Sequence, residues 1–273
     1  MVQGIVRLIV FLLDTAVVIL IVLVASLADR HAKLAYRIAQ YWAWINVKLC
    51  GSRVHVQGLE HLDSKRSYVF MSNHRSNFDV LVLVVALWDF QLRWVAKEEL
   101  ARIPGFGWAL RATKHIIVNR ADHTQAIASL AVAKERIRNG ISVVFFPEGT
   151  RGENRMLPFK KGGFVFAIET ATPVVPIGIT GTARILPRAG WLVRRGGDVN
   201  VTVCSPVPTA HLSLDDRAAL LGEVERAIAA CAEGAGVAAE PAGRDGAQGA
   251  SHVASKGAPH VASQAAARSG VAR

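Results

Sequence analysis

The sequence between residues 51 and 233 predicts an α/β fold, in which a mainly parallel sheet is flanked by helices. Short apolar runs rich in Val, Ile and Phe alternate there with segments that have the period of a helix. This alternation is typical of strand–helix–strand units, which build parallel sheets covered by helices. Hydrophobic residues make up 51% of the 273-residue chain, enough to bury a core, which excludes a wholly disordered protein. They do not form many long runs, which excludes a membrane protein with many spans.

The expected elements follow one another with turn residues between them. The expected strands are residues 68–71, 93–96, 116–118, 142–146, 174–179 and 200–204. The expected helices are residues 77–88, 106–112, 124–139, 162–169 and 214–231. Gly140 follows the third of these helices as a C-cap, and Ser213 with Asp216 forms a capping box at the start of the last.

An apolar run from residue 8 to residue 27 dominates the N-terminal region. At about 1.5 Å per residue, a helix of this length is roughly 30 Å long, the thickness of a bilayer core. Asp14 interrupts the run, and a carboxylate at the middle of a membrane costs about 3 kcal/mol. A spanning helix and a helix that dips into one leaflet both fit this pattern. We expect residues 1–50 to form a membrane anchor.

Cations and aromatic residues follow the apolar run. The cations Arg30, His31, Lys33 and Arg37 lie on its C-terminal side; for a spanning helix, the positive-inside rule then places the rest of the chain in the cytoplasm. Residues 35–49 contain two tyrosines and two tryptophans, which predicts an interfacial helix at the headgroup level. The alternative is that these rings pack on the soluble domain. We therefore expect the protein at the inner membrane, with residues 51–233 facing the cytoplasm.

The C-terminal region, residues 234–273, consists mainly of Ala, Gly, Ser and His, with no apolar residue larger than valine. Such a segment cannot form a core, so we expect it to be disordered. His252 and His260 lie in this tail, and we do not expect them to bind a metal.

The three cysteines, Cys50, Cys204 and Cys231, are widely spaced and odd in number. This pattern excludes a disulfide framework and a Cys-x-x-Cys zinc site, and a reducing cytoplasm is the simplest location for it. The sequence has no metal-ligand motif and no Walker loop. We therefore expect neither a metal nor a cofactor.

Basic residues exceed acidic ones, with 32 Lys and Arg against 21 Asp and Glu and a formal net charge of +11. This balance indicates nucleic acid or an anionic surface as a partner, or only a surface that keeps the protein soluble. The sequence has no zinc finger, no RNP-like strand and no basic region with heptads. Anionic lipids or phosphorylated substrates are therefore the expected partners, and nucleic acid is not.

The first candidate site follows the expected strand at 68–71, where residues 73–79 read Asn-His-Arg-Ser-Asn-Phe-Asp. Open α/β sheets place their sites where a strand ends and a helix begins, and an imidazole suits proton removal near neutral pH. Asp79 could accept the Nδ1 hydrogen of His74 and leave Nε2 free to act as general base on a substrate hydroxyl. The spacing alone is not specific, since Asp79 would equally cap the helix and His74 could be a structural histidine.

A second cluster follows the expected strand at 142–146, where the chain continues with Glu148, Gly149, Thr150 and Arg151. A glycine and a hydroxyl beside an arginine can cradle an oxyanion, because the guanidinium binds phosphate with two N–H groups. An ordinary turn is the alternative.

Two further cations, Lys97 and Arg120, end expected strands. In a parallel sheet they would meet Arg151 in one crevice. Scattered surface charge is the competing interpretation of each.

Four sequence blocks occur in order, namely Asn-His-Arg-Ser-Asn-Phe-Asp (73–79), Ile-Ile-Val-Asn-Arg (116–120), Phe-Pro-Glu-Gly-Thr-Arg (146–151) and Val-Pro-Ile (175–177). Together with Phe-Lys-Lys-Gly at 159–162, they resemble the motif blocks of the glycerolipid acyltransferases. The blocks look closest to those of bacterial 1-acyl-sn-glycerol-3-phosphate acyltransferases. The resemblance covers roughly residues 45–210, and the four blocks together are highly specific.

This resemblance implies the glycerolipid acyltransferase fold, with an N-terminal helical pair embedded in one membrane leaflet. It also implies transfer of a fatty acyl group from acyl-CoA or acyl-carrier protein to a lysophospholipid hydroxyl, with His74 as the general base and Asp79 as its orienting partner. The residues implied for the acceptor's phosphate are Arg120, Arg151 and Lys97, with Glu148, Gly149 and Thr150 shaping that site. The residues implied for the acyl side are Val175, Pro176 and Ile177.

The chain departs from the family pattern at three positions. Lys114 and Asn119 stand where the second block usually has Gly and Asp, and Gly152 stands where a Ser often follows the third block. These departures leave the base and the arginines intact, and they bear on the identity of the acceptor.

The expected reaction converts lysophosphatidic acid to phosphatidic acid by direct attack of its hydroxyl, because no G-x-S-x-G nucleophile elbow is present. One alternative is the same chemistry on another acceptor, such as a lyso-ornithine lipid, glycerol phosphate or another lysophospholipid. The other is a catalytically inactive membrane scaffold that binds anionic lipid.

Overall fold

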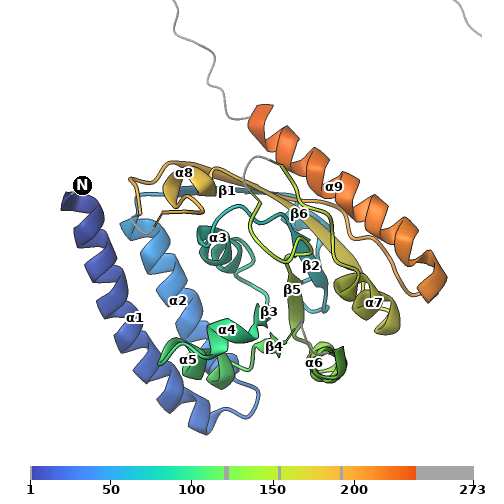
Figure 1. Ribbon diagram of the computed structural model, residues 1–273, viewed down its shortest axis with the longest axis horizontal. Coiled ribbons are helices and arrows are strands. Elements are labelled where there is room, and N and C mark those ends of the chain that lie inside the picture. Colours follow the sequence, from blue (N-terminus) through green and yellow to red (C-terminus); the bar gives the residue numbers. More distant parts are fainter. Residues whose placement is uncertain (1, 120–122, 153–154, 191–192, 238–273) are drawn as a thin grey trace, which may run out of the picture. The chain divides into compact units, whose positions relative to one another are not determined.

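The core of the protein is a seven-stranded sheet with helices on both faces, as the computed structural model shows (Figure 1). The structure describes residues 2–119, 123–152, 155–190 and 193–237. The strands are β1 (Arg53–Gln57), β2 (Val69–Ser72), β3 (Leu92–Lys97), β4 (Ile116–Val118), β5 (Ser142–Phe145), β6 (Val174–Thr180) and β7 (Asp198–Val203). The predicted α/β class is confirmed, and the six expected strands lie within two residues of their predicted bounds.

The strands are ordered β1-β7-β6-β2-β5-β3-β4. The five strands from β6 to β4 are parallel, whereas β7 runs antiparallel to β6 and pairs in parallel with β1. Phe70 of β2 is paired with Val144 of β5 on one side and with Val175 of β6 on the other. The carboxyl ends of β2, β5, β3 and β4 therefore meet at one edge of the sheet.

The helices are α1 (Val2–Ala28), α2 (Lys33–Leu49), α3 (Phe78–Ala86), α4 (Glu98–Ala101), α5 (Phe106–Ala112), α6 (His123–Arg138), α7 (Gly162–Glu169), α8 (Thr182–Ile185) and α9 (Arg217–Val237), with 3-10 turns η1 (Leu59–His61) and η2 (Leu214–Asp216). In Figure 1, α2 and α3 cover one face of the sheet, while α6, α7 and α9 cover the other. Side chains of β2 alternate between the two cores, since Phe70 packs on the α2–α3 side and Val69 and Met71 on the α7–α9 side.

The N-terminal segment forms two antiparallel helices. α1 is long and apolar enough to cross a membrane, and only 6% of its most apolar window is buried. Polar contacts join it to α2, because the Asn46 amide donates to Asp14 Oδ2 at 2.7 Å and the Trp42 indole donates to Thr15 Oγ1 at 3.1 Å. The carboxylate that interrupts the apolar run therefore faces α2.

The aromatic residues of α2 divide between protein and surface. Tyr36 is buried and its ring lies 5.1 Å from the Arg93 guanidinium, whereas Tyr41 and Trp44 are 58% and 44% exposed. Arg93 is itself fully buried in β3 and donates to the carbonyl groups of His31 and Ala32 in the α1–α2 turn. Burial lowers the pKa of this guanidinium to about 10. Arg93 thus ties the turn between the two helices to the sheet.

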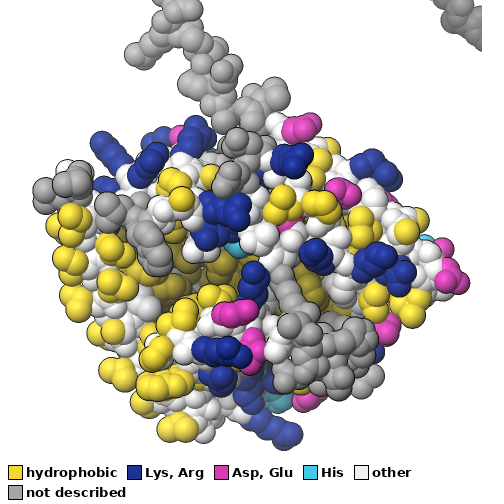
Figure 2. Space-filling model, viewed as in Figure 1, with side chains coloured by type: hydrophobic (Ala, Val, Ile, Leu, Met, Phe, Trp, Pro, Cys, Tyr) yellow, Lys and Arg dark blue, Asp and Glu magenta, His cyan; other side chains and the backbone are white. Residues whose placement is uncertain are grey.

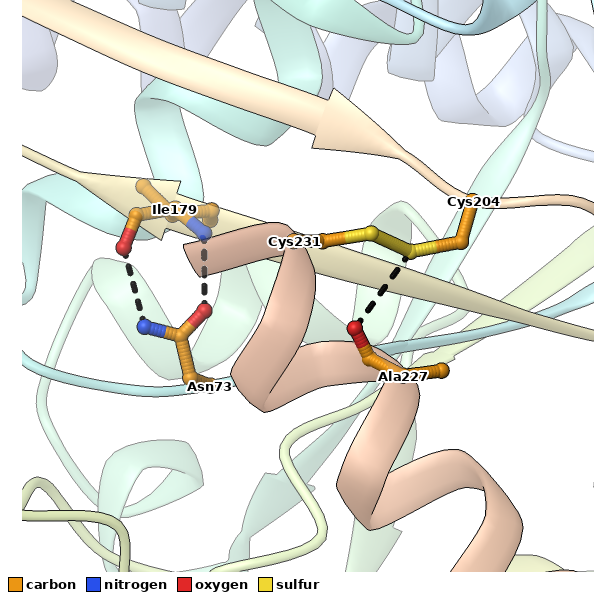
Figure 3. Close-up of a disulfide and its surroundings, with 5 residues drawn as sticks. All are labelled: Asn73, Ile179, Cys204, Ala227 and Cys231. Atoms are coloured by element: carbon orange, nitrogen blue, oxygen red, sulfur yellow. Dashed lines mark hydrogen bonds between the residues drawn. A yellow bond between two sulfur atoms is a disulfide. The ribbon is translucent and has the colours of Figure 1, made fainter. Parts of the chain in front are cut away.

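A disulfide joins Cys204, just after β7, to Cys231 of α9 (Figure 3). Cys50 is free and buried, and the spacing of the cysteines excluded a disulfide framework but did not predict this one bond. The reason is close packing of α9 on β6: a Cβ added to Gly178 would lie 2.4 Å from the Ala232 nitrogen. This packing places two cysteines that are 27 residues apart side by side.

The last helix runs beyond its predicted end and includes residues 234–237 of the predicted tail. The rest of that tail, with His252 and His260, lies outside the described residues. The two predicted caps are present. Gly140 has a φ of +74° and Ser213 and Asp216 form the capping box.

Candidate active site

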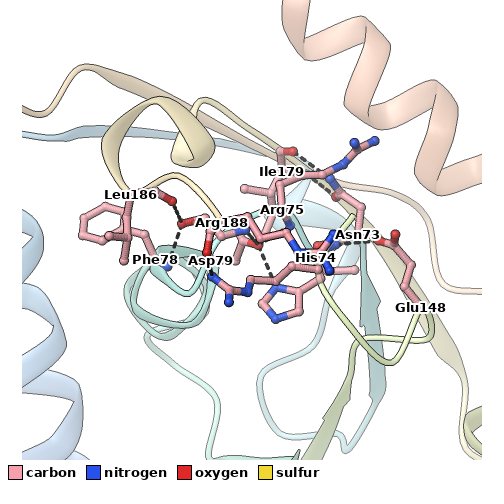
Figure 4. A network of polar contacts seen from close by, with 12 residues as sticks. Asn73, His74, Arg75, Phe78, Asp79, Glu148, Ile179, Leu186 and Arg188 are labelled. Atoms are coloured by element: carbon pink, nitrogen blue, oxygen red, sulfur yellow. Dashed lines mark hydrogen bonds and ion pairs between the residues drawn. The ribbon is translucent and has the colours of Figure 1, made fainter. Parts of the chain in front are cut away.

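His74, in the turn between β2 and α3, forms a hydrogen-bonded pair with Asp79 in the first turn of α3 (Figure 4). His74 Nδ1 lies 2.9 Å from Asp79 Oδ2, and the side chains are 14% and 1% exposed. A buried carboxylate only accepts hydrogen bonds, so the proton of the neutral ring lies on Nδ1 and Nε2 keeps its lone pair. The predicted pair therefore has the geometry of a general base and its orienting partner.

Asp79 also accepts from the chain around it. Its Oδ2 receives the backbone N–H groups of Arg75 at 2.7 Å and Ser76 at 2.9 Å, in addition to the ring of His74. The backbone N–H of Phe78 donates in turn to Ser76 Oγ. Asp79 therefore does both things that the sequence allowed. The same oxygen orients the ring of His74 and caps the N-terminus of α3.

The imidazole of His74 is stacked on Phe146. Their ring centroids are 3.8 Å apart with 10° between the planes, and Trp94 stacks on Phe146 in turn at 5.6 Å. Phe146 comes directly after β5, the neighbour of β2. With one face covered and Nδ1 bound to Asp79, the ring has little freedom to rotate.

Glu148 holds the backbone of His74. Its Oε1 accepts the His74 N–H at 2.7 Å and its Oε2 accepts the Leu157 N–H at 2.8 Å, and the residue is 2% exposed. The N–H of Gly152 donates to the His74 carbonyl at 2.8 Å. The loop of residues 148–152 is therefore hydrogen-bonded to both the N–H and the carbonyl group of His74.

Gly152 departs from the family pattern for a steric reason. A Cβ at this position would lie 2.6 Å from the Arg155 carbonyl oxygen and 3.0 Å from Glu148 Oε2. In this backbone conformation a serine would collide with the carbonyl group of Arg155, three residues further along the chain. The departure is thus part of how this chain packs Glu148.

Asn73 fixes the end of β2 beside β6. Its amide donates to the Ile179 carbonyl at 2.9 Å and accepts the Ile179 N–H at 2.8 Å (Figures 3 and 4). Ser76 donates to the Leu186 carbonyl at 2.7 Å. Sequence reasoning assigned no role to Asn73 or Phe146, although both lie inside the quoted blocks. Their partners are distant in sequence, so no spacing pointed to them.

The predicted phosphate-binding residues are only partly brought together. Arg151 follows Glu148 in the same loop, and its guanidinium donates to the Arg188 carbonyl at 3.1 Å. In that loop Gly149 has a φ of +75° and Thr150 is exposed. Lys97 is exposed at the end of β3, two strands from β2 and so roughly 10 Å away across the sheet. Arg120 lies outside the described residues.

The predicted acyl-side residues belong to the core. Val175, Pro176 and Ile177 are all buried in β6, where Pro176 is paired with Met71 and Ile177 with Ser72 of β2. They lie next to the strand that leads to His74, and their side chains are packed against protein.

The site thus combines an oriented base at the sheet edge with an arginine in the adjoining loop. Residues 53–180 match the protein family described as Acyltransferase.

The relatives make the resemblance more particular. The chain is 33% identical over 201 residues to the chloroplastic 1-acyl-sn-glycerol-3-phosphate acyltransferase BAT2 of Brassica napus, which covers 71% of this chain and 58% of the relative. It is 34% identical over 184 residues to the 1-acyl-sn-glycerol-3-phosphate acyltransferase alpha of Homo sapiens, covering 66% and 64%. The chain therefore spans less than two thirds of the length of these relatives.

A solved structure is also similar. The 1-acyl-sn-glycerophosphate (LPA) acyltransferase PlsC of Thermotoga maritima matches with a TM-score of 0.71 and 26% identity, covering 89% of this chain and 99% of that chain. The similarity therefore includes the N-terminal helices as well as the sheet.

Proposed function

We propose that the protein transfers a fatty acyl group from a thioester to the sn-2 hydroxyl of lysophosphatidic acid, which gives phosphatidic acid. The observation that carries this proposal is the 2.9 Å contact between His74 Nδ1 and a buried carboxylate, which leaves Nε2 as a proton acceptor. The similarity to acyltransferases named for this acceptor supports the choice of substrate.

The proposed reaction is direct attack. Nε2 of His74 takes the proton of the lysolipid hydroxyl while the oxygen attacks the thioester carbonyl, and a tetrahedral oxyanion forms. Collapse of this intermediate breaks the C–S bond, and the imidazolium returns the proton to the leaving thiolate. The products are phosphatidic acid and the free thiol of CoA or of acyl-carrier protein. Asp79 stabilises the imidazolium during this cycle, and the reaction needs no cofactor.

The acceptor's phosphate would be bound by cations at the same sheet edge. Arg151 is the best placed of them, because its loop is hydrogen-bonded to the backbone of His74 on both sides through Glu148 and Gly152. Lys97 would contribute from the end of β3, and Arg120, which follows β4 in the sequence, is the third proposed cation. An arginine binds phosphate with two parallel N–H groups, which would fix the distance from phosphate to hydroxyl.

The protein would be attached to the cytoplasmic leaflet of the inner membrane without crossing it. α2 packs on the catalytic domain, since Arg37 and Gln40 both donate to the Trp88 carbonyl just after α3. α1 is antiparallel to α2 and bonded to it through Asp14 and Asn46. A perpendicular α1 that crossed the bilayer would draw α2 and the flank of the domain into the membrane with it. Insertion of α1 along one leaflet avoids this cost.

The reaction is tested with purified full-length protein in mixed micelles that contain oleoyl-CoA and lysophosphatidic acid. Free thiol and phosphatidic acid are measured in the same sample. We expect one thiol for each phosphatidic acid formed. Thiol without phosphatidic acid would indicate hydrolysis or another acceptor, and neither product would support the inactive scaffold. Replacement of lysophosphatidic acid by lysophosphatidylglycerol or glycerol phosphate tests the acceptor, and acyl-carrier protein in place of CoA tests the donor.

A further inference from the structure

A second apolar surface adjoins α1. Residues 98–112 form a helical hairpin, α4 followed by α5, and we call this segment the α4–α5 hairpin. Three of its large apolar side chains point outward: Leu100 is 41% exposed, Ile103 is 47% exposed and Trp108 is 59% exposed. Single exposed apolar residues are common on proteins, but a group of this size on one short hairpin indicates a contact surface.

The hairpin has a fixed shape. A Cβ on Gly107 would lie 2.1 Å from the Ala101 carbonyl oxygen, so the two helices touch through their backbones. The Arg111 guanidinium donates to that same carbonyl at 2.7 Å, and Gly105 makes the connection with a φ of +75°. The outward side chains are therefore held outward by the hairpin itself.

The surface is continuous with α1. Ala109 and Ala112 of α5 pack into the small apolar cluster around Val22 of α1, and a Cβ on Gly105 would lie 3.6 Å from Ile19 Cδ1. Beyond this contact, α1 exposes Leu20, Val24 and Leu27, with exposed fractions of 65%, 68% and 88%. Figure 2 shows hydrophobic side chains gathered over α1 and continuing over the region of α4 and α5.

Cations border this surface. Arg111 is exposed at the end of α5, and Lys114 follows it, with its ammonium group donating to the Arg30 carbonyl in the α1–α2 turn. Arg102 pairs with Glu98 at 3.1 Å and stays exposed. An apolar surface with cations at its border matches the acyl and anionic headgroup layers of a bilayer.

We propose that the α4–α5 hairpin is a second lipid-docking element, which places Ile103 and Trp108 at the headgroup level of the leaflet that holds α1. This inference rests on the membrane attachment in the proposed function. Tryptophan favours this level because its indole combines an apolar body with one N–H donor. α4 begins directly after Lys97, the last residue of β3, at the sheet edge that also carries His74. Docking of the hairpin would hold this edge against the bilayer, so that a lysolipid reaches His74 without leaving the membrane.

The docking is tested with full-length protein that carries one NBD-labelled cysteine. The labelled variants are Trp108→Cys, Leu20→Cys on α1 and Leu214→Cys, where Leu214 precedes α9 on the other side of the sheet and is 44% exposed. Each is mixed with phosphatidylethanolamine–phosphatidylglycerol vesicles that contain doxyl-labelled lipid. We expect quenching at positions 20 and 108 and none at 214. Quenching at position 20 without quenching at position 108 overturns the docking of the hairpin and leaves the attachment of α1 intact. Absence of quenching at 20 overturns the attachment of α1, and the inference with it.

A rate measurement separates docking from a structural role. Trp108→Glu should raise the KM for long-chain lysophosphatidic acid in vesicles about tenfold, the effect of about 1.4 kcal/mol, while the kcat for a water-soluble short-chain acceptor stays unchanged. Leu214→Glu is the matched control, and neither quantity should change in it. If Trp108→Glu lowered kcat/KM equally for the vesicle-bound and the water-soluble acceptor, Trp108 would support the fold, and the docking role would be overturned.

Discussion

The β2–α3 turn and the α1–α2 pair are held in opposite ways. In the turn, one oxygen of Asp79 accepts three N–H groups, and the backbone of His74 is bonded on both sides. In the helix pair, the most apolar stretch of α1 is only 6% buried within the protein. The turn finds its partners within the chain, whereas the helix pair keeps an apolar surface that a lipid phase would cover. Substitutions in the turn should therefore change the rate, whereas charged residues in place of the exposed apolar side chains of α1 should weaken binding to the membrane and leave the chemistry intact.

The largest effect is expected at Asp79. Asp79→Asn keeps the size of the side chain but removes the negative charge that stabilises the imidazolium and strengthens the three hydrogen bonds to Oδ2, and it no longer favours the tautomer with the proton on Nδ1. We expect kcat to fall about 10³- to 10⁴-fold, as for the equivalent change in a His–Asp pair of a serine protease. Initial rates of phosphatidic acid formation measure this. Asp89→Asn, at an exposed position after α3, is the control and should keep full activity. Similar rates for both variants would contradict the role of Asp79.

A smaller loss is expected at Glu148. In Glu148→Gln one of the two carboxylate oxygens becomes an NH2 group, so either the His74 N–H or the Leu157 N–H loses its acceptor. An unsatisfied buried donor costs about 1–3 kcal/mol, which corresponds to a fall in kcat of about 10- to 100-fold if the backbone of His74 shifts. The exposed Glu60→Gln is the matched control. Thermal unfolding of both variants shows whether the loss lies in the site or in the fold as a whole.

Phe146 holds the imidazole of His74 by stacking on it. Phe146→Leu removes the aromatic face below His74, and an aromatic pair contributes about 0.5–1.5 kcal/mol. We expect kcat to fall by up to roughly tenfold, with most of the activity kept in Phe146→Tyr. Phe90 contacts Phe70 edge to face in the core and makes no ring contact with His74 among the described residues. Phe90→Leu should lower the unfolding temperature and leave kcat unchanged. Equal activity of Phe146→Leu and Phe146→Tyr would show that the aromatic ring at position 146 does not contribute to the rate.

The smallest effect is expected in the helix pair. Asn46→Leu removes the donor to Asp14, and hydrogen bonds between membrane helices contribute about 0.6 kcal/mol on average. The variant should keep its kcat and its vesicle binding, while cleavage by trypsin in the α1–α2 turn becomes slightly faster. Lys48→Leu, on the exposed face of α2, provides the comparison. A loss of activity as large as that of Glu148→Gln would show that the two regions are coupled.

The same contrast explains what the sequence could predict. Strands with apolar runs rich in Val, Ile and Phe were predicted within two residues of their bounds. The spacing of His74 and Asp79 left a structural alternative open, and the resemblance of the four sequence blocks decided for a base and its orienting partner. β1 was missed because it alternates exposed and half-buried residues at the edge of the sheet. The bonds of Asn73 to Ile179, and the pairing of Cys204 with Cys231, join segments that are distant along the chain. Such contacts exist only after the sheet has formed, so local patterns carry no trace of them.

The most direct test of the account compares two histidines of this chain. His74→Ala removes the proposed base, whereas His55→Ala removes an exposed histidine of edge strand β1 that pairs with Asp198 of β7. Both proteins are assayed in mixed micelles with oleoyl-CoA and lysophosphatidic acid, and their binding to vesicles is measured alongside. We predict that His74→Ala binds vesicles normally and forms no phosphatidic acid above background, while His55→Ala matches the unaltered protein. Phosphatidic acid formed by His74→Ala at the rate of His55→Ala would contradict the account.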